Sequence, residues 1–183
     1  MGESGLFADV VARFAAAKTD MTVDGSKKGS MDNTALSLSG EVGHRYDLAK
    51  DFFVEPQAEV AYTDVDADKL RLGSATCDYD ASESLITRVG ADVGLTSPNN
   101  KGSVCARVSA VHECLGETKV TGQVGGTTAA VEAFDGKDTW VEFGIGANLN
   151  ITPTTYVRAD VDRTEGAALD EDRRAAVGVR DAF

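Results

Sequence analysis

The sequence has little proline, little cysteine and no excess of positive charge. Its 183 residues include three prolines and three cysteines, and 18 basic residues stand against 30 acidic ones, which gives a formal net charge of −12. The missing basic footprint argues against binding to nucleic acid, because phosphate backbones are bound by clustered lysine and arginine. The chain also lacks an apolar run of about 18 residues, so no transmembrane helix is predicted.

Aromatic residues are scarce at 7%, but 42% of the residues are hydrophobic. This composition lies above the range of disordered chains, and the length predicts one domain over residues 1–183. A membrane β-barrel is not excluded by these numbers, because each of its strands carries an apolar pattern on only one face.

The few reactive side chains do not assemble a recognisable chemical site. Cys105 and Cys114 lie too far apart on one expected strand for a disulfide, and with Cys77 the odd count leaves at least one thiol unpaired. No cysteine or histidine spacing typical of a metal site occurs. His112 and Glu113 are neighbours on a strand and therefore point to opposite faces. We predict no catalytic residues, no metal and no cofactor, and expect the chain not to be an enzyme.

Alternating apolar and polar residues recur along the whole chain. The clearest run is Val141–Ile151, in which valine, phenylalanine, isoleucine, alanine and leucine alternate with glutamate, glycine and asparagine. A period of two predicts β-strands. Phe14–Ala17 is the one stretch that could also end a helix. Strands are predicted near residues 5–17, 34–48, 51–64, 83–96, 102–115, 138–151, 153–163 and 173–183.

The connections between these strands alternate between long and short. Residues 18–33, 65–82, 116–137 and 164–172 are long and polar, whereas residues 49–50, 97–101 and 152 are short. In an up-and-down antiparallel sheet this places all short turns, and both termini, at one end. Outer-membrane barrels have this layout. The glycines share the polar face with the charged residues, which suits a crowded lumen better than a solvent-exposed face. We therefore predict an all-β fold, an antiparallel up-and-down transmembrane-type β-barrel with about eight strands in this chain.

Five segments carry motifs in a fixed order: Phe52–Glu59, Ser84–Gly90, Ala106–Glu113, Trp140–Asn148 and the C-terminal strand Val177–Phe183, which ends in phenylalanine. Together they resemble one family, the translocator β-barrel domain of autotransporters (type V secretion). The resemblance covers roughly residues 5–183. The family barrel has about twelve strands, so the chain resembles the C-terminal two-thirds of such a domain.

The resemblance implies a domain in the outer membrane of a Gram-negative bacterium that anchors, or helps to translocate, an N-terminal passenger polypeptide. Outer-membrane lipid and the barrel-assembly machinery are the further partners it implies, and Val177, Val179 and Phe183 would form the C-terminal assembly signal. Self-association through open strand edges is a further expectation. The expected lumen-lining residues are Glu41, Arg45, Glu55, Glu59, Arg88, Asp92, Arg107, Glu113, Glu142 and Arg180. Arg88 and Glu142 are the residues most expected to make contacts across the lumen, because both lie mid-strand within the clearest motifs.

The chain departs from the family pattern where lipid-facing aromatic or aliphatic residues are usual. The replacements are Ala110, Cys114, Arg163, Arg173 and Asp181, and Asp64 and Cys105 also stand where an aromatic residue is expected. Two alternatives therefore stay open at this point. One is a soluble or engineered β-barrel that serves as a scaffold or carries a small ligand. The other is an outer-membrane enzyme of the omptin or lipase type.

Overall fold

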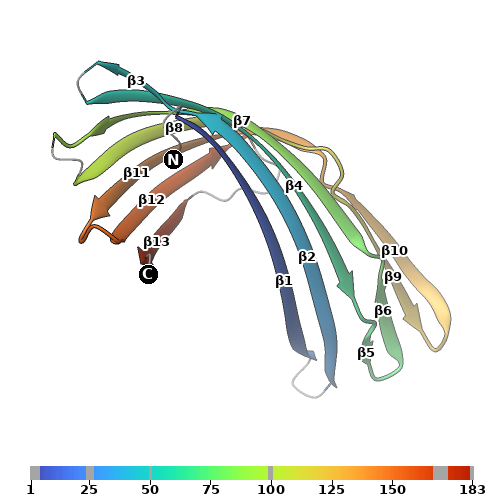
Figure 1. Cartoon of the computed structure of the whole chain (residues 1–183). Coiled ribbons are helices and arrows are strands. Elements are labelled where there is room, and N and C mark those ends of the chain that lie inside the picture. The colour runs from blue at the N-terminus through green and yellow to red at the C-terminus, as the bar shows by residue number, and fades with distance from the viewer. Residues whose placement is uncertain (1–4, 24–26, 50, 99–100, 167–172, 182–183) are drawn as a thin grey trace.

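The computed structural model describes residues 5–23, 27–49, 51–98, 101–166 and 173–181. These residues form thirteen β-strands, arranged in one nine-stranded and one four-stranded sheet (Figure 1). Within these ranges no helix is long and apolar enough to cross a membrane.

The large sheet is an antiparallel meander in which sequence neighbours pair. Its order is β1-β2-β4-β7-β8-β11-β12-β13, with the short β3 added beside β4. The bounds of its strands are β1 Leu6–Val23, β2 Lys27–His44, β3 Tyr46–Ala49, β4 Phe52–Ala67, β7 Ser82–Thr96, β8 Gly102–Glu113, β11 Asp138–Asn150, β12 Thr155–Glu165 and β13 Arg174–Asp181.

The predicted strands are confirmed, including the ambiguous first one. Ala15 pairs with Ala35 in the middle of the β1–β2 ladder, so the alanine-rich stretch is extended and not helical. The prediction of a long loop over residues 18–33 was wrong. β1 runs on to Val23 and β2 already begins at Lys27. Polar side chains support this extension, since the Asn33 amide donates a hydrogen bond to the Thr19 hydroxyl at 3.0 Å.

Two other expected loops contain a second sheet. Its strands are β5 Leu70–Leu72, β6 Ala75–Tyr79, β9 Glu117–Val124 and β10 Thr127–Asp135, in the order β10-β9-β6-β5. β5 crosses close to β2, where a Cβ on Gly29 would lie 2.4 Å from the Arg71 carbonyl oxygen. Residues 65–82 and 116–137 had been expected as plain polar loops. Their hairpins pair with each other over a long sequence separation, which the local pattern does not reveal.

The large sheet curls into an arch that is open on one side (Figure 1). The connections β3–β4, β7–β8 and β11–β12 lie at one end together with the N-terminal end of β1 and the C-terminal end of β13, whereas the long hairpins extend from the other end. This confirms that the predicted short turns and both ends of the chain share one end of the sheet, but the predicted alternation of long and short connections does not hold for the first connection, because β1 runs to Val23 and β2 begins at Lys27. In the described residues β1 and β13 do not pair with each other, so both are edge strands and the barrel is not closed by these strands.

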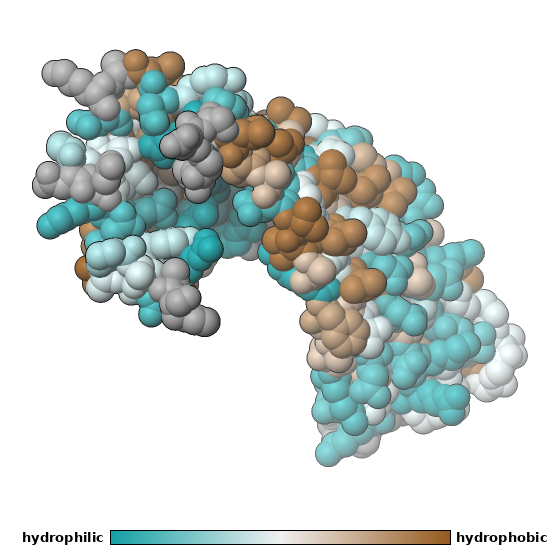
Figure 2. All heavy atoms as spheres, in the orientation of Figure 1, coloured by the Kyte–Doolittle hydropathy of each residue, from teal (hydrophilic) through white to brown (hydrophobic). Residues whose placement is uncertain are grey.

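The apolar side chains of the large sheet point outward. The convex face carries exposed apolar residues on each long strand, among them Val10, Val60, Val89, Val108, Ile145, Val161 and Val177. Figure 2 shows such brown patches on the outside of the arch and a largely teal inner surface. By contrast, only Phe53, Leu70 and Val111 are buried apolar side chains among the described residues. The sheet is therefore turned inside out relative to a soluble barrel.

Candidate functional site

The concave face of the large sheet encloses a polar hollow of about 1130 Å³. Side chains from β1, β2, β4, β7, β8, β11, β12 and β13 line it, because every second residue of each strand points inward. Nine residues predicted for a lumen belong to this lining: Glu41, Arg45, Glu55, Glu59, Arg88, Asp92, Arg107, Glu142 and Arg180.

The tenth predicted residue, Glu113, does not line the hollow. Its side chain is buried at the long-hairpin end of β8, where its carboxylate accepts hydrogen bonds from the backbone N–H groups of Leu85 at 2.8 Å and Leu115 at 3.0 Å. The Ser84 hydroxyl donates a further hydrogen bond to it. Glu113 therefore holds β7 and the residues after β8 together.

Arg88 links three strands across the middle of the hollow. Its Nη1 lies 2.9 Å from Glu59 Oε2 on β4, and its Nη2 lies 3.1 Å from Glu142 Oε2 on β11. β8 runs between β7 and β11. Its residue opposite Arg88 is Val111 and its residue opposite Glu142 is Ser109, so the ion pair crosses β8 diagonally. Both of these β8 residues are 1% exposed. The structure thus brings Arg88 and Glu142 together along one wall of the hollow, two strands apart, whereas the sequence led us to expect contacts across the lumen.

A second ion pair lies nearer the short-turn end. Arg107 on β8 and Asp92 on β7 are directly opposed in the ladder, and two guanidinium nitrogens donate to the two carboxylate oxygens at 2.8 Å each. Asp92 also accepts a hydrogen bond from Gln57 Nε2 at 3.4 Å, and the Cys105 thiol lies 3.6 Å from its other oxygen. Such bidentate pairs fix both side chains in position.

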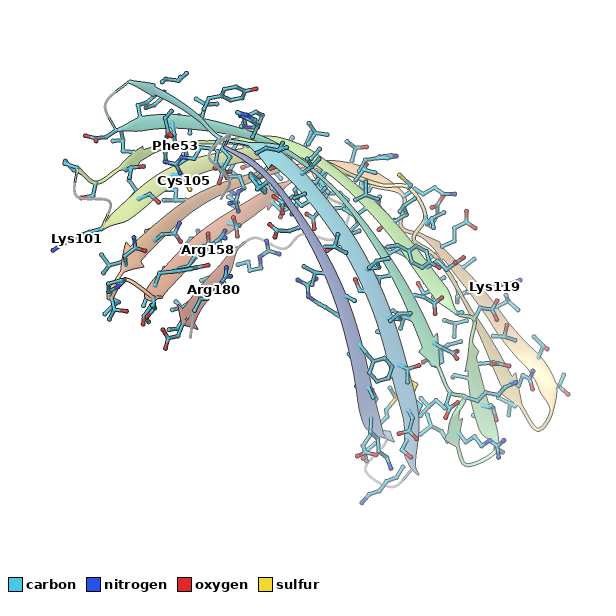
Figure 3. All side chains as sticks on the ribbon, viewed as in Figure 1. Phe53, Lys101, Cys105, Lys119, Arg158 and Arg180 are labelled. Carbon is cyan, nitrogen blue, oxygen red and sulfur yellow. The ribbon has the colours of Figure 1, made fainter. Side chains whose placement is uncertain are left out.

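The charges in the hollow are unevenly distributed. Asp9 on β1 is opposite Glu41 on β2, which is opposite Glu59 on β4, so three carboxylates form one row. Directly opposed like charges destabilise a sheet. Among the described residues, Arg88 forms an ion pair with one member of this row, Glu59, and it is shared with Glu142. The other side of the hollow is rich in arginine, and Figure 3 shows Arg158 and Arg180 there, on β12 and β13.

Phenylalanine rings fill the hollow beside glycines. A Cβ on Gly94 would lie 2.5 Å from Phe53 Cζ, and a Cβ on Gly43 would lie 2.4 Å from Phe7 Cζ. The Arg45 guanidinium stacks on the Phe53 ring at 3.6 Å from its centroid and donates to the Thr96 hydroxyl at 2.7 Å. The glycines of the polar face therefore provide space for rings and long side chains. These larger side chains narrow this end of the hollow.

The remaining candidate residues carry no assembled chemistry. Cys77, Cys105 and Cys114 are all free and half-buried. Cys105 lines the hollow on the concave face, whereas Ala110 and Cys114 have the outward positions that the sequence predicted to face lipid. His112 is exposed and lies 2.8 Å from the Thr139 hydroxyl, whereas Glu113 points to the other face. Among the described residues no three histidine, cysteine or acidic side chains are grouped as for a metal ion.

Sequence reasoning missed several lining residues. Phe53, Cys105, Arg158, Asp160 and Asp162 all belong to the hollow. Arg158, Asp160 and Asp162 alternate along the predicted strand 153–163, so a period of two places them on the same side as Tyr156. The signal for these residues was present in the sequence.

Comparison with known proteins places this arrangement in a family context. The profile described as the Autotransporter beta-domain matches residues 1–162. Similar curated proteins include Serine protease EspC of Escherichia coli O127:H6 (strain E2348/69 / EPEC), which is 24% identical over 195 residues and covers 99% of this chain. Serine protease EspP of Escherichia coli is 24% identical over 196 residues, and Serine protease SepA autotransporter of Shigella flexneri is 24% identical over 194 residues, covering 100% and 98% of this chain. The chain spans 14% of the length of each of these relatives.

Proposed function

The chain belongs to the autotransporter β-domain family, a family of outer-membrane translocator domains, and from this membership we propose that its polar hollow holds or passes a passenger polypeptide while its convex face contacts lipid. The passenger would be a segment of the same polypeptide that precedes this domain. The mechanism is passive. An extended or helical segment in the hollow would replace its contacts with water by contacts with the charged and polar groups that line the hollow.

The inverted distribution of side chains is the observation that carries this proposal. Ile145 is 69% exposed and Val177 is 77% exposed on the convex face, whereas Asp92 on the concave face is only 5% exposed. A continuous apolar face of this size is unfavourable in water and marks a surface that is covered by another apolar phase. Lipid is the phase that fits a family of outer-membrane domains.

β1 and β13 are edge strands in the described part of the chain, and a barrel in the membrane requires partners for both. In lipid every backbone N–H and C=O group has to be paired, so an open sheet edge is not stable in the hydrocarbon region. We propose that this chain provides the C-terminal two-thirds of a barrel, and that further strands pair with β1 and β13. Pairing between two copies of the chain through the same edges is the competing arrangement, and the mass of the complex separates the two.

We further propose that the C-terminal strand carries the signal by which a barrel-insertion machinery assembles this domain. Val177 and Val179 are exposed on the convex face, whereas Phe183 lies outside the described residues. The proposed signal is this apolar row with the terminal phenylalanine.

We assign no enzymatic activity to the domain in this proposal. The relatives are named serine proteases, but the family that matches this chain is described as a β-domain, and the chain covers a small share of those proteins.

Two measurements test the proposal. We expect the folded protein to require detergent or lipid and to migrate faster on a denaturing gel before heating than after. A monomer that stays folded in plain buffer contradicts the membrane placement.

Occupancy of the hollow is tested by thiol labelling in the full-length protein. Cys105 lines the hollow, whereas Cys77 lies on β6 of the second sheet and serves as the matched control. We expect a passenger segment to protect Cys105 from a charged maleimide and to leave Cys77 reactive. Equal labelling of Cys105 with and without the passenger refutes a passenger in the hollow.

A further inference from the structure

The convex face contains a separate apolar groove of about 670 Å³ at the short-turn end of the sheet. It runs over β7, β8, β11 and β12, and it does not belong to the polar hollow on the other side of the sheet. Nearly all of its lining is carbon, yet two charged side chains, Asp51 and Lys101, stand at its border.

Two opposed alanines form the floor of the groove. Ala147 on β11 pairs with Ala159 on β12, and both side chains point outward. Val104 on β8 is opposite Ala147, Leu149 is its second neighbour along β11, and Leu95 on β7 lies beyond Val104. Each of these three larger side chains is 54% exposed. The alanine side chains are shorter than the neighbouring leucine and valine side chains. The surface is therefore lower over the two alanines than around them. Such a depression on a lipid-facing surface fits a hydrocarbon chain.

The two charged residues at the border come from neighbouring short connections. Asp51 lies between β3 and β4, and Lys101 directly precedes β8. Figure 3 shows Lys101 at the tip of the β7–β8 connection, away from the hollow. Neither residue forms an ion pair with another part of the chain that the structure describes, and the two do not pair with each other. A cation and a carboxylate that form no ion pair within the described part of the chain therefore both line the apolar groove.

We propose that this groove is a binding site for one zwitterionic phospholipid. An acyl chain lies on the Ala147–Ala159 floor, the phosphate lies beside the Lys101 ammonium, and the primary ammonium of the headgroup lies beside the Asp51 carboxylate. This inference rests on the proposed placement in a membrane. A lipid with a net negative headgroup fits less well, because Asp51 and the net charge of −12 repel it.

The lysine side chain suits this position in a membrane. A long aliphatic stem can follow the apolar surface while its ammonium stays at the level of the headgroups. The short turns that carry both charges lie at the end of the apolar band, where the interface between hydrocarbon and water is expected. The groove thus combines a site for the tail and a site for the headgroup at the matching height.

The experiment measures lipid retention by native mass spectrometry. The protein is purified in a mild detergent and exposed to equimolar phosphatidylethanolamine and phosphatidylglycerol. We expect one phosphatidylethanolamine per chain to be retained preferentially. The double variant Ala147→Leu, Ala159→Leu fills the floor and should reduce this retention at least tenfold. Ala110→Leu, an outward alanine on β8 outside the groove, is the matched control and should retain the lipid.

The headgroup contacts are tested separately. We expect Lys101→Gln to weaken retention several-fold, and Asp51→Asn to shift the preference toward phosphatidylglycerol. Equal retention by the wild type, the double leucine variant and the control overturns the site. A protein that inserts into vesicles and shows heat-modifiable migration, but retains no discrete lipid, overturns this inference alone. A protein that does not insert overturns the proposed function with it.

Discussion

Replacing Arg88 by methionine should destabilise the barrel measurably. The guanidinium donates to Glu59 at 2.9 Å and pairs with Glu142 at 3.1 Å, so its removal leaves two inward carboxylates without a cation. A fully buried pair broken in this way costs roughly 3–5 kcal/mol. Here the Arg88 side chain is 28% exposed and the hollow admits water, so screening lowers the value. We expect a loss of about 2 kcal/mol in the free energy of unfolding.

The assay is urea unfolding in lipid vesicles or detergent, followed by tryptophan fluorescence. Trp140 is the only tryptophan, and its indole N–H donates to Glu142 at 3.2 Å, so the probe lies beside the perturbed site. Glu142→Gln keeps this acceptor and should cost about 1 kcal/mol, and the double variant should fall short of additivity by about 1 kcal/mol.

Arg163→Met is the matched control for Arg88→Met. Arg163 pairs with Glu165 at 2.9 Å, but both side chains are more than half exposed, so loss of this ion pair should cost almost nothing. Because Arg163 has an outward, lipid-facing position opposite Phe143, its replacement by methionine should leave stability unchanged or raise it. If Arg88→Met unfolds at the same urea concentration as this control, or if the double variant is additive, the three-strand ion pair does not stabilise the fold and the reasoning fails.

Three other perturbations test the two faces and the second sheet. Gly94→Ala should cost about 1–3 kcal/mol in unfolding free energy, because the new Cβ would overlap a phenylalanine ring, whereas Gly40→Ala meets no atom within 4 Å and should be neutral. Ile145→Lys places a charge on the convex face and should reduce folding into vesicles by about 2–4 kcal/mol if that residue lies near the bilayer midplane. The Lys137 ammonium donates to Glu117 at 2.6 Å, which raises the pKa of Lys137. The stabilising contribution of this lysine is present below its unfolded pKa and is lost as pH rises through the raised value, so proteolysis of the β9–β10 hairpin should increase at high pH and in Lys137→Ala.

Specific results would contradict each of these expectations. Equal unfolding of the two glycine variants would show that the ring can move aside without cost. Unchanged insertion of Ile145→Lys would show that the convex face does not contact hydrocarbon. A hairpin whose proteolysis near neutral pH, where Lys137 is protonated, is the same in Lys137→Ala and in the wild type would show that the ion pair does not hold it.

Much of the large sheet was predictable from local patterns. Strand positions, their antiparallel order and the end at which the short turns gather all follow from alternation and loop length. The same alternation placed most inward charges, for example Glu41 and Asp92, because a strand residue and its second neighbour share one face. The extension of β1 and β2 to Val23 and Lys27 was missed, because polar residues on both faces conceal a strand.

Local sequence patterns did not predict the pairing of the second sheet or the environment of Glu113. β6 pairs with β9 over more than forty residues of chain, and no periodicity within either segment identifies its partner. Glu113 has the inward parity of a lumen residue, but its carboxylate is used by backbone groups at the end of β8. Which inward residue lines the hollow and which one caps a strand end depends on the strands beside it.

The sequence by itself determined that this chain forms a curled antiparallel sheet with an apolar and a polar face, because side-chain alternation is a local property of each strand. Only the tertiary structure decided the register across strands. That register lets Arg88 reach Glu142 diagonally across β8, aligns Asp9, Glu41 and Glu59 in one row, and sets two alanines side by side on the convex face. A register shift by two residues would preserve every face and would remove all three arrangements, so they cannot be read from alternation alone.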